Sequence, residues 1–268
     1  MKELFAKAEK YIRENGNTLQ KTCLDYITGK ADKQKVIEEL SRYQNSDGGW
    51  ANGLEIEYPG EASSPFTTAV ALGYISKFGL AETDLLKNTL EYLHNTQAKN
   101  GMWDDTEEML KYPHPTYMGP GIYTDYKTGM NLKWLLRLNV CDKNMLDKAQ
   151  EYLIDKFVEV EKSNDFFSAV AYSSAFSLLP HVAEYKKIME WSMKILMPQE
   201  GQFGWQQLSG MIEDEIPIPE QVLKLSIDLI KQNQEPDGGW PHKFGTYNRV
   251  WSAIFILRFL KKMHNLSI

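Results

Sequence analysis

Hydrophobic positions along the chain follow two alternating helical patterns. In the first pattern, hydrophobic residues form a single stripe and charged residues fill the rest, as Leu86, Leu90 and Leu93 do in the segment 83–97. The same pattern recurs in the segments 33–44, 143–158, 182–196 and 220–234. An apolar stripe with this spacing indicates a helix that covers a core with one face.

The second pattern has no polar side. The segments 66–78 and 246–257 contain one charge each, 166–179 contains none, and 123–138 is a more polar member of the group. Helices that are apolar all round must be buried on every side. Alternation of the two patterns predicts two concentric layers, so we expect an all-α protein, an α/α toroid or double-layer helical barrel.

Three long connections interrupt the helical patterns. The segments 51–65, 104–121 and 206–219 are rich in Pro, Gly and aromatic residues, and we expect them to be ordered loops. The last of them breaks the alternation, because no apolar helix follows Trp205. We interpret this position as one where an inner helix is degenerate or missing.

A spacing of Gln, five residues and Trp recurs four times. The copies are named here the first to fourth Gln–Trp turns, and they span Gln44–Trp50, Gln97–Trp103, Gln199–Trp205 and Gln234–Trp240. The first and fourth share Asp-Gly-Gly-Trp, in which Gly offers the left-handed residue that closes a helix. A Gln amide can accept from one backbone group and donate to another, so we expect these eight residues to be structural.

This motif, placed between an amphipathic and a buried helix, resembles the repeat of terpenoid cyclases and protein prenyltransferase β subunits. The resemblance covers about 33–261 and implies a toroid with a central cavity, in which Gln and Trp clamp neighbouring helices. The chain looks most like small single-toroid bacterial proteins called prenyltransferase-like, for which no activity is established. We therefore expect one domain over 1–268, with N-terminal helices in 1–32 before the repeats.

Composition narrows the function. The chain has 268 residues, a net charge of −6 and no basic block, which argues against nucleic acid as a partner. Its two cysteines, Cys23 and Cys141, form neither a disulfide framework nor a zinc motif. We find no signal peptide and no transmembrane segment, and expect a cytoplasmic protein. The oligomeric state is left open. Aromatic residues reach 12%, which favours a ligand site.

The loop after the first turn carries Glu55 and Glu57. A carboxyl group at the mouth of an apolar cavity has a raised pKa and can act as a general acid or base. We therefore name Glu55 as a catalytic candidate and Glu57 as a ligand-binding candidate. The alternative interpretation is a solvated loop acid, or a charge at the N-terminus of the following helix.

The segment Trp103-Asp104-Asp105-Thr106-Glu107-Glu108 contains the letters of the DDxxE pattern that binds magnesium in class I isoprenoid synthases. Asp104, Asp105 and Glu108 are thus weak metal candidates, and Mg²⁺ is the cofactor they would hold. We favour a different interpretation, in which Asp104 or Asp105 caps a short helix that contains Glu107 and Glu108. No cofactor is therefore predicted.

The connection 112–127 supplies aromatic residues with few charges, the usual composition of a small-molecule site. Asp125, near the start of an inner helix, is the second catalytic candidate. The further ligand-binding candidates are Tyr117, Tyr123, Lys127, Tyr247 and Trp251.

Three functions compete for this sequence. The first is binding of a mainly apolar, isoprenoid-type ligand in a central cavity, with or without catalysis, since aromatic rings stabilise cations. The second is a carbohydrate-active lyase or hydrolase that uses Glu55 and Asp125 as acid and base. The third is a non-catalytic binding scaffold. The expected partner is accordingly a small apolar or sugar-like ligand.

Overall fold

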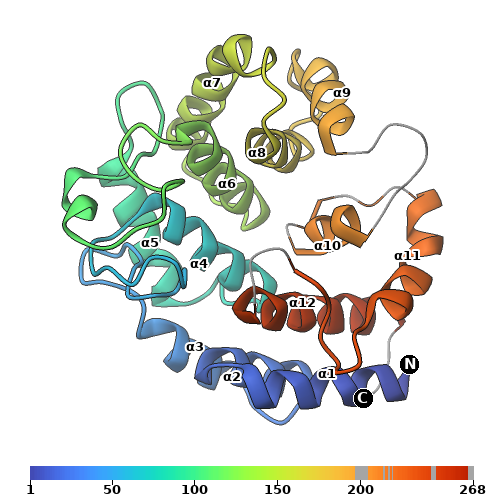
Figure 1. The fold of residues 1–268 in the computed structure, drawn as a ribbon. Helices are drawn as coiled ribbons and strands as arrows, with labels where there is room; N and C mark the ends of the chain where they lie inside the picture. The colour runs from blue at the N-terminus through green and yellow to red at the C-terminus, as the bar shows by residue number, and fades with distance from the viewer. Residues whose placement is uncertain (197–204, 214, 217, 219, 243–245, 265–268) are drawn as a thin grey trace. The chain divides into compact units, whose positions relative to one another are not determined.

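The computed structural model describes residues 1–196, 205–213, 215–216, 218, 220–242 and 246–264. Its described residues form helices and no strand, which confirms the predicted all-α class. The helices are α1 (Lys2–Asn15), α2 (Thr18–Ile27), α3 (Lys33–Ser41), α4 (Pro65–Lys77), α5 (Asp84–Thr96), the 3₁₀ helix η1 (Glu107–Lys111), α6 (Thr124–Arg137), α7 (Lys143–Val160), α8 (Phe166–Phe176), α9 (Tyr185–Leu196), α10 (Trp205–Glu213), α11 (Glu220–Asn233) and α12 (Thr246–His264) (Figure 1).

The chain forms two compact units. Unit 1 contains residues 1–39 and 197–268, and unit 2 contains residues 40–196. The single domain expected over 1–268 stays a prediction, and each unit is described by itself. No helix among the described residues is both long and apolar enough to cross a bilayer.

Unit 2 is built in two layers. Helices α4, α6 and α8 pack side by side, and α5, α7 and α9 each cover one of them (Figure 1). The inner helices are those without a polar face, and nine of the eleven residues of α8 are buried. The outer helix α5 buries one stripe that includes Leu86 and Leu93 and leaves its charged positions in solvent. The two hydrophobic patterns therefore correspond to the two layers of this unit.

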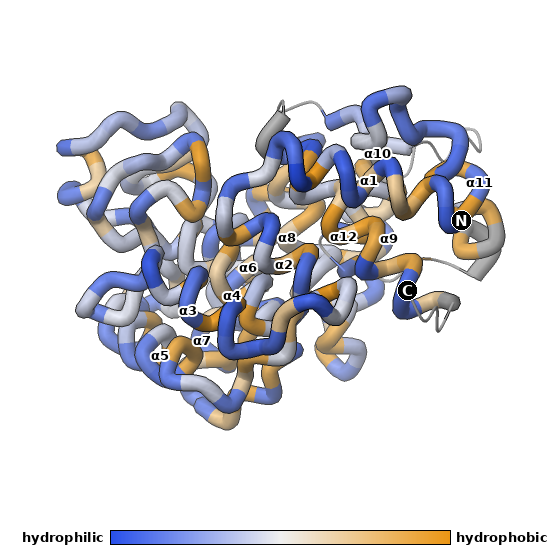
Figure 2. Tube along the Cα trace, turned by 90° about the horizontal axis from the view of Figure 1, so that it is seen from below, coloured by the Kyte–Doolittle hydropathy of each residue, from blue (hydrophilic) through white to orange (hydrophobic). Residues whose placement is uncertain are grey.

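Unit 1 gathers helices from both ends of the sequence. Helix α12 packs against α1, α2 and α10, and α10 also packs against α11. In the view of Figure 2, hydrophobic positions gather on helices such as α12, while much of the connecting chain is hydrophilic. The expectation of a loop over 206–219 was wrong for its first half. Helix α10 lies there and buries Leu208, Met211 and Ile212, an apolar spacing too short to stand out in the sequence.

Three of the four Gln–Trp turns dock on another outer helix in the same way. The side-chain amide of Gln44 donates to Leu85 O on α5 at 3.0 Å, that of Gln97 to Met145 O on α7 at 2.9 Å, and that of Gln234 to Leu4 O on α1 at 2.9 Å. Each of these amides also donates to a carbonyl of its own turn at 3.0 Å, on Gly48, Gly101 and Gly238 respectively. One side chain therefore joins the end of one helix to the first turns of another.

The glycine in each of these turns contacts the helix on which the turn docks, three residues after the residue that the glutamine binds. A Cβ on Gly48 would come within 2.1 Å of Asn88 O, one on Gly101 within 2.0 Å of Lys148 O, and one on Gly238 within 2.2 Å of Lys7 O. All three glycines have φ between 86° and 94°, the left-handed region. Only glycine suits both the backbone angle and the close approach.

The tryptophans of these three turns are fully buried, and each indole N–H has an acceptor. Trp103 donates to Leu93 O at 2.9 Å, Trp240 to Ile230 O at 2.8 Å, and Trp50 to Thr89 Oγ1 at 2.8 Å. The third turn differs. Its Gln199 lies outside the described residues, and Trp205 begins α10, where its indole donates to Pro241 O at 2.9 Å and stacks on Trp240.

Candidate functional site

Five partly buried rings lie together in unit 2, four of them at the N-terminal ends of the inner helices and the fifth, Tyr117, on the connection 104–121. They form a continuous group that we call the aromatic cluster, made of Phe66, Tyr117, Tyr123, Tyr126 and Phe167. Neighbouring ring centroids are between 5.4 and 6.5 Å apart. Phe166, 43% exposed, extends the group by an edge contact with Phe167. A partly exposed aromatic group of this kind suits an apolar or flat ligand.

Helix starts fix the positions of these rings. Ser64 caps α4 by accepting from the backbone N–H of Phe66 at 3.1 Å, and Pro65 follows as the first helical residue. Asp165 caps α8 by accepting from the N–H of Ser168 at 2.6 Å. Tyr123 precedes α6 with a left-handed φ of 47°. The three caps set the first turns of α4, α6 and α8, which carry the rings.

Two carboxyl groups adjoin the cluster. The Tyr117 hydroxyl donates to the Glu57 carboxylate. Burial raises the pKa of Tyr117, and this hydrogen bond and the charge of Glu55 raise it further. Burial raises the pKa of Glu55 from 4.5 to about 7, with a further contribution from the negative charge of Glu57. Glu55 is therefore poised to hold or release a proton near neutral pH, a property of general acids and bases.

A buried ion network holds the connection 104–121 against α6. The Lys127 ammonium donates to Asp104 Oδ1 at 2.5 Å, to Asp105 Oδ2 at 2.9 Å and to Gly119 O at 2.9 Å. These three bonds use its three hydrogens, and the Lys127 side chain is 0% exposed. Lys127 was predicted to bind ligand, and in the structure its ammonium group is bound by acceptors of the protein itself.

The aspartates of this network also bind backbone. Asp105 accepts from Gly119 N at 2.9 Å and from the Ser64 hydroxyl at 2.5 Å, and Asp104 accepts from Gly121 N at 2.7 Å. Gly119, two residues after Tyr117, is bound by both Asp105 and Lys127, so the ion network holds the segment that carries this ring. Buried charges require such complete pairing.

The short helix predicted after Asp105 exists as η1, with Glu107 and Glu108 in its first turn. The prediction that Asp104 or Asp105 caps it was wrong, because Thr106 is the capping residue and both aspartates face Lys127. Glu108 pairs with Lys111 at 2.5 Å. Among the described residues, no group of three or more His, Cys, Asp and Glu side chains is arranged to hold a metal ion.

Asp125 lies in the first turn of α6 and is 5% exposed. Its Oδ2 atom is buried without a hydrogen-bond partner in the described part of the chain. Burial raises the pKa values of Tyr123 and Tyr152, and the negative charge of Asp125 makes a smaller contribution to both. Trp251 belongs to unit 1, where it is buried and stacks on Phe255. The side chain of Tyr247 lies outside the described residues.

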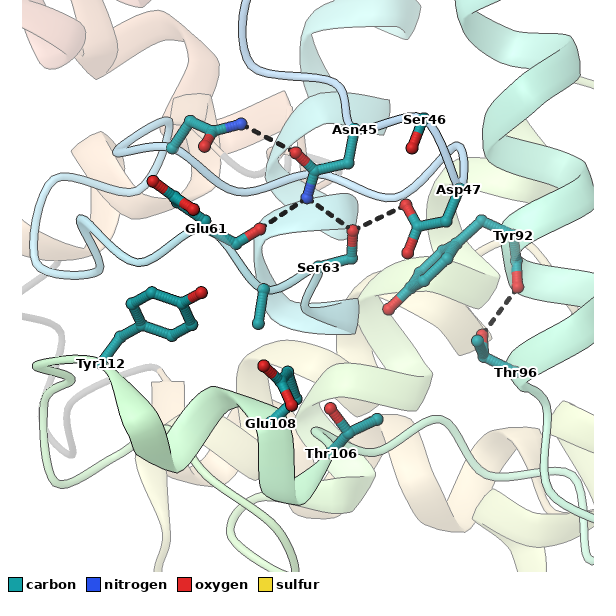
Figure 3. Close-up of a pocket in the computed structure, with 12 residues that line it drawn as sticks. Asn45, Ser46, Asp47, Glu61, Ser63, Tyr92, Thr96, Thr106, Glu108 and Tyr112 are labelled. Atoms are coloured by element: carbon teal, nitrogen blue, oxygen red, sulfur yellow. Dashed lines mark hydrogen bonds between the residues drawn. The ribbon is translucent and has the colours of Figure 1, made fainter.

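Unit 2 also contains an open polar pocket of about 590 Å³ at the first Gln–Trp turn. One side consists of Asn45, Ser63 and Asp47, joined by hydrogen bonds, and Thr106 and Glu108 lie opposite (Figure 3). The remaining lining residues are Ser46, Asn52, Glu61, Ala62, Tyr92, Thr96 and Tyr112. Sequence reasoning missed this pocket, because it joins segments that are up to 67 residues apart in the chain.

Comparison with known proteins gives one partial similarity. A 78-residue stretch is 35% identical to part of a probable squalene–hopene cyclase of Sinorhizobium fredii (strain NBRC 101917 / NGR234). The similarity is to a terpenoid cyclase. It confirms the resemblance predicted from the Gln–Trp spacing, and it covers 27% of this chain and 12% of the length of that relative. No family model matches the chain.

Proposed function

We propose that the aromatic cluster of unit 2 binds an uncharged, isoprenoid-type ligand. The observation that carries this proposal is the continuous set of five partly exposed rings with two carboxyl groups beside it. Rings of this kind bury apolar surface and attract positive charge that develops on a bound ligand. The partial similarity to a squalene–hopene cyclase supports the same ligand class.

The charges beside the aromatic cluster favour an uncharged isoprenoid over a charged one. The charged groups that act on the Tyr117 hydroxyl are the carboxyls of Glu55 and Glu57, and the Lys127 ammonium beneath is saturated by protein acceptors. A diphosphate placed beside these acids would be repelled. The ligand is therefore a hydrocarbon or an alcohol rather than a prenyl diphosphate.

Glu55 is the group proposed to move a proton. With a pKa of about 7, it is partly protonated at neutral pH and can give a proton to a ligand or take one from it. Asp125, whose buried Oδ2 has no partner among the described residues, is the second candidate for contact with the ligand. Tyr117, Tyr123 and Glu57 are proposed to line the site.

The proposed architecture is the α/α toroid. Three Gln–Trp turns dock on an outer helix at the same register, and one of these three, the fourth turn, docks on α1, the first helix of the chain. This repeated docking of a turn on an outer helix supports the proposal, because a toroid is built from helical hairpins that repeat one contact.

Ligand-induced stabilisation tests the proposal directly. We expect farnesol and geranylgeraniol to raise the melting temperature of the protein, and the corresponding diphosphates to raise it less. Phe167→Leu, which removes a central ring, should abolish the shift, while Phe5→Leu in α1 serves as the matched control. A shift that is larger with the diphosphates, or unchanged in Phe167→Leu, would contradict the proposal.

The carbohydrate alternative makes a different prediction. Rings beside two carboxyl groups also suit the faces and hydroxyls of sugars, and Glu57 already accepts from a hydroxyl group, that of Tyr117. Stabilisation by oligosaccharides that is lost in Phe167→Leu, without any effect of isoprenoid alcohols, would favour this function over the first.

A further inference from the structure

Asparagine followed by glycine occurs three times in the chain, at Asn15-Gly16, Asn52-Gly53 and Asn100-Gly101. Such a pair can modify itself. The backbone nitrogen of the glycine attacks the side-chain amide carbon of the asparagine, and the amide nitrogen leaves as ammonia with the proton of the glycine N–H. The resulting five-membered succinimide ring is then opened by water at either carbonyl, which yields aspartate or isoaspartate. The reaction therefore needs water alone as a co-reactant.

The glycine must meet two conditions for the ring to close. Its N–H must be free of a hydrogen bond, because the nitrogen attacks after it has lost this proton. The backbone must also be able to rotate, so that the nitrogen reaches the side chain, and a glycine has no Cβ to oppose this rotation. A folded chain can therefore protect one such pair and leave another reactive.

Two of the three pairs are protected at their glycine. Gly16 N donates to Ile12 O at 2.8 Å, and a Cβ on Gly16 would come within 2.6 Å of the same oxygen. Gly101 N donates to Ala98 O at 2.9 Å, and a Cβ on Gly101 would come within 2.0 Å of Lys148 O. Both glycines are buried, so hydrogen bonding and packing hold both backbones in place.

The third pair has neither protection. Gly53 N has no acceptor in the described part of the chain, and no atom beyond its neighbouring residues lies within 4 Å of a Cβ added to Gly53. Asn52 is exposed, and its side-chain amide makes one hydrogen bond, from Nδ2 to Asn45 Oδ1 at 3.0 Å. Asn52 and Gly53 have φ of 60° and 78°, so ring closure requires rotation out of this left-handed turn. The open surroundings of Gly53 permit that rotation.

We propose that Asn52 is a site of spontaneous deamidation in the folded protein, where it becomes aspartate and isoaspartate while Asn15 and Asn100 persist. The product carries one more negative charge, and isoaspartate has one more carbon atom in its main chain. Asn52 lines the polar pocket at the first Gln–Trp turn, and a carboxylate in its place has no hydrogen to donate to Asn45 Oδ1. The modification therefore alters the start of the connection 51–64, which also carries the catalytic candidate Glu55.

Peptide mass spectrometry of the whole chain tests the proposal. The purified protein is kept at mildly alkaline pH, which speeds ring closure, and samples are digested at acidic pH, which stops it. Deamidation raises the mass of a peptide by about 1 Da, and labelling with a protein isoaspartate methyltransferase counts the isoaspartate. We expect Asn52 to react at least about tenfold faster than Asn15 and Asn100, because the glycines of the other two pairs must first break a hydrogen bond.

The same incubation in urea controls for the sequence around each pair. Unfolding removes hydrogen bonds and packing from all three glycines, so we expect the three rates to agree within about threefold. Two variants complete the test in the folded chain. Asn52→Gln, whose longer side chain cannot form the five-membered ring, should remove most of the isoaspartate, and Asn100→Gln should leave its amount unchanged.

Three results would overturn the proposal. The first is reaction at Asn15 or Asn100 in the folded chain that is as fast as at Asn52. The second is persistence of Asn52 in the folded chain after all three pairs have reacted in urea. The third is an equally large lead of Asn52 in urea, which would assign the preference to the sequence rather than to the fold. None of these results depends on the isoprenoid proposal, because no ligand is added.

Discussion

The first and fourth Gln–Trp turns use the same docking residues and end in different surfaces. In both, a glutamine and a glycine fix the turn on an outer helix. At the fourth turn Arg249 closes the space above the tyrosine, and α12 begins only six residues after Trp240. At the first turn Ser63 takes the place of the arginine beside Gly49, and residues of the connections 51–64 and 104–121 line the polar pocket next to it. The docking residues therefore set the fold, and the residues around them decide whether a turn is closed or forms a pocket.

The largest effect should follow Lys127→Met. In the described part of the chain, Lys127 is the cation that pairs with the fully buried Asp105 side chain, so this variant leaves that charge unpaired, and we expect a loss of about 3–5 kcal/mol in the free energy of unfolding. The connection 104–121, which carries Thr106, Glu108 and Tyr112 of the pocket, should detach. Urea unfolding measures the loss, and the indole signals of Trp50 and Trp240 should show perturbation at the first turn alone. An equal change at both signals would contradict this view.

Alanine at the turn glycines should cost about 2–3 kcal/mol at either turn, because both the left-handed backbone and the helix carbonyl oppose a Cβ. The variants are Gly48→Ala and Gly238→Ala. Gly53→Ala and Gly29→Ala are matched controls, since these glycines have positive φ but no atom within 4 Å of the added Cβ. Urea unfolding of all four variants separates docking from backbone strain. If the controls lose as much stability, the close approach to the helix does not matter.

Arg249→Ala should destabilise the protein by about 1–2 kcal/mol, because Asp237 and Glu235 lose a partly buried partner. Thermal unfolding measures the loss. Stability that is unaltered by the substitution would show that the guanidinium does not hold the turn.

The smallest effect concerns Glu55, which lies in the connection 51–64 that follows the first turn. Because the folded-state pKa is raised to about 7 from 4.5, the folded protein retains a proton that the unfolded chain releases over this range. Stability should therefore fall as pH rises from about 4.5 to 7. The full shift would correspond to about 3 kcal/mol, and we expect about 1 kcal/mol because the Glu55 side chain is only partly buried and solvent screens it. Glu55→Gln should abolish this fall and be more stable than the unaltered chain at pH 8. An unchanged pH dependence in urea unfolding would contradict a raised pKa.

The sequence predicted the helices well because their stripes have a clear period. The predicted segments 83–97 and 143–158 became α5 and α7 with shifts of at most two residues. The short helix α10 was missed, because its apolar stripe runs over only nine residues. The resemblance to terpenoid cyclases was also predicted from the spacing of Gln and Trp alone.

The candidate site was predicted only in its local parts. Glu55 and Glu57 beside Tyr117 were named from loop composition, and their juxtaposition came from the structure. The ion pair of Lys127 with Asp104 and Asp105 could not be predicted, because its members lie on different elements and one-dimensional patterns suggested a cap instead. The sequence did contain a signal for the helices on which the turns dock, because each has a tyrosine at the same position. Tyr11, Tyr92 and Tyr152 each lie four residues after the residue whose carbonyl contacts a turn glycine.

The most direct measurement is the NMR shift of the indole N–H signals of Trp50 and Trp240 in the Arg249→Ala variant. The account predicts a shift of the Trp240 signal and an unchanged Trp50 signal, because the Arg249 guanidinium binds Trp240 O, Asp237 and the Tyr11 ring at the fourth turn, whereas Ser63 takes its place at the first. An unchanged Trp240 signal, or a shift of equal size at Trp50, would contradict the account.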